Sequence, residues 1–185
     1  LSTPKVSTVI SHPLEAPRVS IFATDAKTYA SSARAQGKSY TLIIDNLTVV
    51  GWSGSTSLRS VEYFGSMLPL LTYDGAYVIL IHHNTPQQYD AAIAGLSRVC
   101  PFLASYDVKY LICSKQEIDW DTDYMDQTLS RYSEIPALQN DLPAEDHWLY
   151  QKYTHIQKED FADIEPIHDT TPYFEYEEFA VRKNQ

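Results

Sequence analysis

One segment constrains the fold of this chain more than any other: residues 40–47, which read YTLIIDNL. A nearly unbroken apolar run of this length is typical of a parallel strand that is covered on both faces. The run ends in Asp45 and Asn46, and ligands of open α/β sheets bind just beyond the carboxyl ends of such strands. These two side chains are therefore the first candidates for a functional role.

The same pattern occurs twice more nearby, in residues 19–25 (VSIFATD) and 76–83 (AYVILIHH). Between the first two runs, Asp25 is positioned to cap a helix that ends at Gly37. Helical spacing of apolar residues also predicts helices after residue 58 and over 86–99, the latter followed by an apolar run at 108–113. Strands that alternate with helices predict an α/β fold with a doubly wound, mainly parallel sheet.

Charge divides the chain in two. With 185 residues and a net charge of −10, the chain has room for one ordinary domain, but residues 1–113 carry a net charge of +1 and residues 114–185 a net charge of −11. We therefore expect a Rossmann-like core over 1–113. We expect an acidic, aromatic-rich extension over 114–185 to pack on it and to end in a closing strand at 174–181.

The composition of the chain limits the kinds of molecule that it is expected to bind. An acidic chain without a Lys/Arg cluster disfavours nucleic acid and favours a cationic small molecule or a basic protein surface. No apolar run approaches the roughly 20 residues of a membrane-spanning helix.

Cys100 and Cys113 fit two buried thiols in a reducing compartment, which predicts a cytoplasmic location, and one structural disulfide is the alternative. The chain begins with Leu1, so a processed product or a fragment of a longer protein is expected.

Four pieces of the sequence, taken in order, resemble the class I S-adenosylmethionine-dependent methyltransferase superfamily, and within it the spermidine-synthase-like (aminopropyltransferase-like) domains. These pieces are Asp25-Ala26, residues 40–46, residues 61–64 (VEYF) and residues 74–78 (DGAYV). The resemblance implies a methyltransferase-type Rossmann-like fold. It also implies a transferase that uses S-adenosylmethionine or decarboxylated S-adenosylmethionine and acts on a small or cationic acceptor.

The resemblance also implies roles for individual residues. Asp25 would accept a hydrogen bond from the adenine amino group, and Ala26 and Asp45 would line the same cofactor. Either Asp45 or Asn46, depending on the register of the strand, would face the reacting centre. A carboxylate there can orient an amine and take its proton. Trp52 and His82 are expected near the acceptor.

One departure opens an alternative function. The glycine-rich first loop of the superfamily is missing, because no glycine precedes Gly37. The sheet is therefore expected to be incomplete at its N-terminal side, or the chain to have lost its cofactor. The alternative to an enzyme is a catalytically inactive scaffold or interaction module, or one half of a composite site. Assembly with another copy or another chain is compatible with both.

Each candidate also has a purely structural interpretation. Asp25 can act as a helix N-cap alone, and Asp45 and Asn46 can satisfy their own turn. His82 is at least as well explained as a structural histidine. No histidines fall at metal-ligand spacing, and the acidic residues 119–123 lack the glycine of a calcium loop, so no metal site is predicted.

Overall fold

The computed structural model describes residues 19–46, 56–81, 85–106, 110–118, 121–133 and 154–170. The helices of these ranges are α2 (Ala26–Ala35), α3 (Val61–Met67), α4 (Pro86–Val99) and α5 (Thr122–Ser133). The strands are β1 (Tyr40–Asp45), β2 (Leu71–Leu80), β3 (Phe102–Tyr106), β4 (Tyr110–Ser114) and β5 (Thr154–His155). Short 3-10 helices are η2 (Thr56–Arg59), η3 (Leu68–Leu70) and η5 (Lys158–Phe161).

The five strands form one mixed sheet in the order β1-β2-β4-β3-β5. β1 pairs with β2 in parallel, whereas β4 is antiparallel to both β2 and β3, and β5 is antiparallel to β3. β1, β2 and β3 therefore run in one direction, with β4 inserted between two of them in the other direction. The predicted α/β fold class is confirmed in this mixed form.

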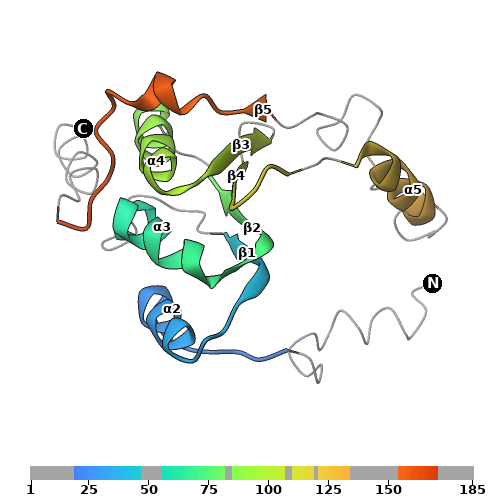
Figure 1. The fold of residues 1–185 in the computed structure, drawn as a ribbon, viewed down its shortest axis with the longest axis horizontal. Coiled ribbons are helices and arrows are strands. Elements are labelled where there is room, and N and C mark those ends of the chain that lie inside the picture. The colour runs from blue at the N-terminus through green and yellow to red at the C-terminus, as the bar shows by residue number, and fades with distance from the viewer. Residues whose placement is uncertain are drawn as a thin grey trace, which may run out of the picture.

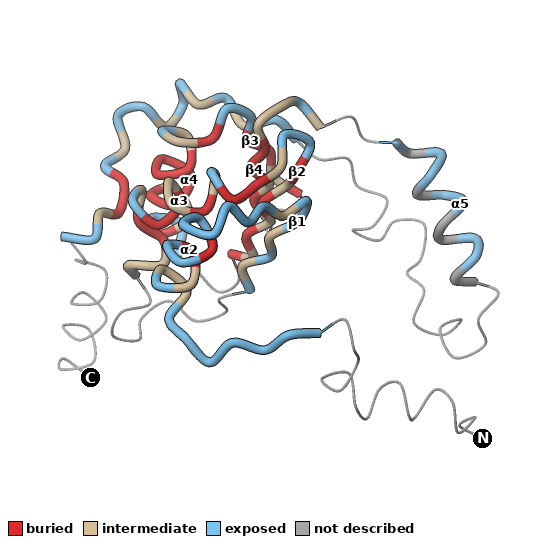
Figure 2. The backbone as a smooth tube through the Cα atoms, turned by 60° about the horizontal axis from the view of Figure 1, so that its bottom comes forward, coloured by how far each residue is buried: buried red, intermediate tan, exposed pale blue. Residues whose placement is uncertain are grey.

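Helices α2, α3 and α4 lie side by side on one face of the sheet (Figure 1). The core forms between these helices and the inward-facing residues of the strands, as the buried stretches in Figure 2 show. Tyr77 and Ile79 of β2 and Leu111 of β4 are among the most buried side chains. They alternate with less buried neighbours, which is the pattern of a strand with one covered face.

Strand β1 is formed as predicted, but one of its two faces is not covered by other described elements. Leu42 and Ile44 are 52% and 64% exposed, while Ile43 between them packs against the core. The apolar run at 40–47 was expected to be covered on both faces, and this expectation is wrong for the described part of the chain. The reason is that the described helices that pack on the core all lie on the opposite face of the sheet (Figure 1).

The predicted strand at residues 19–24 is wrong. This segment has no strand hydrogen bonding, and its apolar side chains Val19, Ile21 and Phe22 are exposed. Phe22 instead packs its ring 5.1 Å from the ring of Tyr29 on α2. Of these three side chains, Phe22 meets a helix surface, and the structure describes no neighbouring strand that pairs with the segment.

The predicted helix at 86–99 is confirmed as α4. Thr85 and Gln88 form a complete capping box at its start, and Pro86 occupies the first turn, where a missing N–H costs nothing. β2 begins at Leu71 and runs through residues 73–75. The ladder between β1 and β2 is irregular there, with Tyr40 opposite Leu71 but Leu42 opposite Ala76.

Cys100 and Cys113 are joined in a disulfide, so the prediction of two thiols is wrong and the stated alternative is confirmed. Cys100 is the C-cap of α4 and Cys113 lies in β4, opposite Leu103 of β3. The bridge therefore ties the end of α4 to the β3–β4 hairpin. No sequence pattern predicted β3, which lies between the two cysteines.

The described part of the C-terminal region makes two different contributions. Its residues 154–170 add β5 to the sheet edge and then run along α4 toward α3 (Figure 1). Helix α5 stands apart from the sheet in both views, with Tyr124 exposed. The predicted closing strand at 174–181 lies outside the described residues. None of the helices described is both long and apolar enough to cross a bilayer.

Candidate functional site

The strand-end acid Asp45 is the last residue of β1, and its side chain is 8% exposed. Its Oδ2 accepts a hydrogen bond from Arg59 Nη1 at 2.9 Å and a second from the Tyr77 hydroxyl at 3.0 Å. We call Asp45, Arg59 and Tyr77 the buried cluster. The predicted catalytic acid is thus engaged by two donors beneath the surface.

Arg59 reaches this acid because of its place in the chain. It ends η2, immediately before the N-cap of α3, and its side chain is 1% exposed. Its second amino group, Nη2, donates to the carbonyl oxygen of Leu80 at 3.0 Å. One guanidinium therefore joins the ends of β1 and β2. Removal of one partner from such a buried pair typically costs about 3–5 kcal/mol of stability.

Tyr77 and Tyr63 keep the surroundings of Asp45 free of further negative charge. Burial raises the pKa of Tyr77 well above its usual value, and the nearby Asp45 charge raises it further. Burial also raises the pKa of Tyr63, again with Asp45 adding to the effect. Both phenols therefore remain neutral, and the Tyr77 hydroxyl remains a donor to the carboxylate.

The other predicted residues of the β1 end have different surroundings. Asn46 follows β1 and is exposed. Trp52 and His82, predicted near the acceptor, lie outside the described residues. The roles of Trp52 and His82 therefore stay predictions.

Asp25 is exposed and caps α2, as its structural interpretation required. Its Oδ1 accepts a hydrogen bond from the backbone N–H of Thr28 at 2.9 Å. This hydrogen bond lowers the pKa of the Asp25 carboxyl. Ala26, the second predicted cofactor contact, is the first residue of α2 and is half-buried. Although Asp25 caps α2, its side chain stays at the surface, at the helix start where the adenine of the cofactor was expected to bind.

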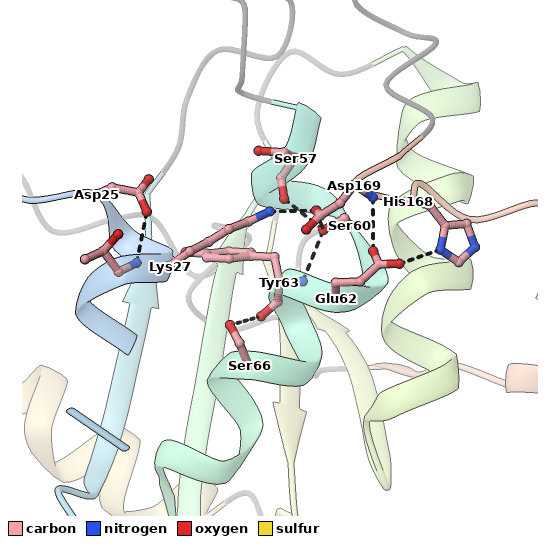
Figure 3. Close-up of polar contacts among 10 residues, drawn as sticks. Asp25, Lys27, Ser57, Ser60, Glu62, Tyr63, Ser66, His168 and Asp169 are labelled. Carbon is pink, nitrogen blue, oxygen red and sulfur yellow. Dashed lines mark hydrogen bonds and ion pairs between the residues drawn. The ribbon is translucent and has the colours of Figure 1, made fainter. Parts of the chain in front are cut away.

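Figure 3 shows a second group of polar residues that the sequence did not predict. A segment near the C-terminus, residues 165–170, which we call the strap, lies across the start of α3. Its Asp169 Oδ1 is 2.6 Å from Lys27 Nζ of α2 and accepts a hydrogen bond from Ser60 Oγ at 2.5 Å. Ser60 is fully buried and is also the N-cap of α3, where its Oγ accepts from Tyr63 N. Asp169 thus links the beginnings of two helices.

The strap makes a second set of contacts with Glu62, which lies two residues after Ser60. His168 Nδ1 is 2.8 Å from Glu62 Oε1, and the backbone N–H of Asp169 donates to Glu62 Oε2 at 3.1 Å. Burial by itself would raise the pKa of Glu62, but these hydrogen bonds outweigh it and hold the pKa below its ordinary value of 4.5. We call the five residues that make these contacts the strap cluster: Lys27, Ser60, Glu62, His168 and Asp169.

Apolar contacts anchor the strap beside these polar ones. Ile167 is 1% exposed, and its carbonyl oxygen accepts from the backbone N–H of Val61 at 2.9 Å. Pro166 next to it is also buried. The partners of Asp169 lie 142 and 109 residues away in the chain. No local spacing could therefore have indicated the contact; the one available signal was Ser60 as an N-cap in front of an apolar helical run.

Comparisons with known proteins support the fold and no more. No protein-family model and no curated protein matches the chain. Among solved structures it is similar to a probable spermidine synthase from Corynebacterium glutamicum ATCC 13032, with a TM-score of 0.53 and 17% sequence identity. That match covers 89% of this chain and 60% of the synthase, so the chain spans about 60% of that protein's length. Human methyltransferase-like protein 13 in complex with SAH is also similar, with a TM-score of 0.49, 18% identity, and coverage of 81% and 69%.

The chain therefore has a class I S-adenosylmethionine-dependent methyltransferase-like fold. The predicted resemblance is confirmed at this level, which concerns the arrangement of strands and helices.

Proposed function

We propose that this chain is a methyltransferase-like module without group-transfer activity of its own, which serves as a binding scaffold. The alternative that the sequence left open thus becomes the leading one. The observation that carries it is the state of Asp45, whose Oδ2 is held by Arg59 and Tyr77 under a nearly closed surface.

A general base must reach the proton that it takes, directly or through one water. Asp45 is instead turned toward the helix-covered side of the sheet, where it joins β1 to the guanidinium that also holds the end of β2. Asn46, the exposed neighbour, carries an amide and cannot take a proton from an amine. Both registers of the predicted active site therefore lack an accessible base.

The acidic C-terminal region is the proposed docking surface of such a scaffold. Its helix α5 exposes Asp123, Tyr124 and Asp126. An exposed aromatic side chain among acids is suited to a basic protein partner, because the ring supplies contact area and the acids supply attraction.

A second candidate function is cofactor binding without Asp45 as base. It is favoured by Asp25, which stays at the surface at the start of α2 although it caps that helix. In this case the module would bind an adenosyl compound along Asp25 and Ala26, as the resemblance implies, and use S-adenosylmethionine or its decarboxylated form as ligand.

Isothermal titration of the purified chain with S-adenosylmethionine, decarboxylated S-adenosylmethionine and S-adenosylhomocysteine separates the two candidates. The scaffold proposal predicts no binding with Kd below about 1 mM, which corresponds to less than about 4 kcal/mol of binding free energy. Micromolar binding that Asp25→Ala abolishes would favour the second candidate. Asp74→Ala is the matched control, since Asp74 is an exposed acid of β2.

A transfer assay completes the test. The chain is incubated with each sulfonium compound and a polyamine acceptor, and the thioether product is measured. No turnover is expected. Turnover by the folded wild type would overturn the proposal, and its loss in a folded Asp45→Asn variant would identify Asp45 as the base.

A further inference from the structure

The carboxylate of Asp169 occupies a place that other elements of the fold build. Lys27 comes from α2 and Ser60 from the start of α3, and both contact the same oxygen, Oδ1 (Figure 3). Ser60 is fully buried, and its Oγ accepts a hydrogen bond from the backbone N–H of Tyr63. The carbonyl oxygen of Ser57, 2.8 Å from the same Oγ, is a second acceptor for the hydroxyl hydrogen and can receive it when Asp169 leaves. One ammonium and one preset hydroxyl thus converge on a single carboxylate oxygen.

The Asp169 side chain is more exposed than Ser60, the buried member of the site. Lys27 and Asp169 are 31% and 38% exposed, and exposed ion pairs of this kind are weak and screened by salt. Ile167, two residues before Asp169, is buried and hydrogen-bonded to α3. The Asp169 side chain can therefore leave Lys27 and Ser60 while Ile167 and the hydrogen bond from Asp169 N–H to Glu62 hold the backbone of the strap in place.

The position is next to the predicted cofactor residues. Lys27 follows Asp25 and Ala26 at the start of α2, and Ser60 follows Arg59 of the buried cluster. A small molecule at this end of the fold could place an acidic group where the Asp169 side chain lies. The Glu62–His168 contact lies beside this place and does not use Lys27.

We propose that Lys27 and Ser60 form a binding site for the carboxylate of a small-molecule ligand, and that Asp169 fills this site while the strap is closed. The ligand displaces Asp169 and takes over both contacts through one oxygen. The strap therefore acts as an internal competitor that sets the affinity for the ligand. This proposal does not depend on whether the chain transfers a group.

The test uses acetate as the probe and Asp169→Asn, which keeps the shape of the side chain and removes its charge. Amide signals of Ser60 and Tyr63 are followed by NMR during titration with sodium acetate, with sodium chloride at equal ionic strength as the reference. In Asp169→Asn we expect saturable shifts specific to acetate. In the wild type we expect at least tenfold weaker binding, because Asp169 competes.

Two further variants make the result specific. Lys27→Gln in the Asp169→Asn background is expected to abolish the acetate response. Asp163→Asn, an exposed acid on the same segment, is the matched control and should behave as the wild type. If Asp169→Asn opens the whole strap, the site becomes more accessible and acetate binding is still expected.

Equal shifts with acetate and chloride in Asp169→Asn would overturn the proposal and leave Asp169 as a docking contact of the strap. A saturable response to inorganic phosphate but not to acetate would also overturn it, since the site would then select another anion. The outcome is independent of the titrations with sulfonium compounds, because acetate carries no adenosyl group.

Discussion

The buried cluster and the strap cluster are built on neighbouring residues, yet they place their charges in opposite surroundings. Arg59 belongs to the first and Ser60 to the second. The ion pair of the buried cluster is 1% and 8% exposed, whereas the Lys27–Asp169 pair is 31% and 38% exposed. A buried pair is expensive to break and holds the fold, while a half-exposed pair is weak and exchangeable. An ion pair therefore stabilises the fold on one side of the η2–α3 junction, whereas the ion pair on the other side can exchange with a ligand.

The largest effect is expected for Arg59→Met, which leaves the Asp45 charge buried without its cation. We expect a loss of about 3–5 kcal/mol in the free energy of unfolding, measured by urea denaturation followed by circular dichroism. Arg34→Met changes an exposed arginine of α2 and should cost less than about 0.5 kcal/mol. Similar losses in both variants would show that the buried Arg59 contributes no more to stability than an exposed arginine does.

A smaller effect is expected for Tyr77→Phe, which removes one of the two donors to Asp45 Oδ2 and keeps the ring. Hydrogen bonds to charged groups contribute about 1.5–3 kcal/mol, so a loss of stability in this range is expected from urea denaturation. Tyr73→Phe at an exposed position of β2 serves as the control, with no measurable change. A neutral Tyr77→Phe would indicate that Asp45 does not need this donor.

A weaker and salt-dependent effect is expected for Lys27→Gln in the strap cluster. The exposed ion pair with Asp169 contributes about 0–1 kcal/mol. The difference in unfolding free energy between wild type and variant should shrink further between 0.05 and 1 M NaCl, about the range over which salt screens exposed charges. A loss above about 2 kcal/mol that is insensitive to salt would contradict the comparison.

The smallest effect is a local response of the strap to acid. The folded pKa of Glu62 lies below 4.5, so its contacts contribute stability above that pH and lose it as the pH falls through the folded value. The amide signal of Asp169, which donates to Glu62, should therefore titrate with a midpoint below 4.5. Glu62→Gln should remove this titration. A midpoint at or above 4.5 in the wild type would show that the strap does not favour the charged carboxyl.

Local patterns were sufficient for much of the fold. The N-cap Asp25, the capping-box helix α4 and the strand at β1 were predicted because each depends on residues a few positions apart. The strand expected at 19–24 is not formed: Phe22 packs on Tyr29 of α2, and Val19 and Ile21 stay exposed. Strand pairing requires a partner that local patterns do not supply.

The candidate site was predictable only in part. Asp45 was found at the end of its strand, but its environment depends on Arg59 and Tyr77, and Tyr77 lies 32 residues further along the chain. The contacts of Asp169 span more than 100 residues. Such contacts carry no periodic signal in one sequence. The sequence also left the state of Cys100 and Cys113 undecided, because spacing alone does not distinguish a disulfide from two thiols.

A double-mutant cycle between Asp45 and Arg59 tests the structural role of the strand-end acid most directly. The unfolding free energies of Asp45→Asn, Arg59→Met and the double variant are compared with that of the wild type. A coupling energy of about 1–3 kcal/mol is expected, so that the double variant loses less stability than the two single variants do together. Additive losses would contradict it, because Asp45 would then be independent of Arg59 and available for another role.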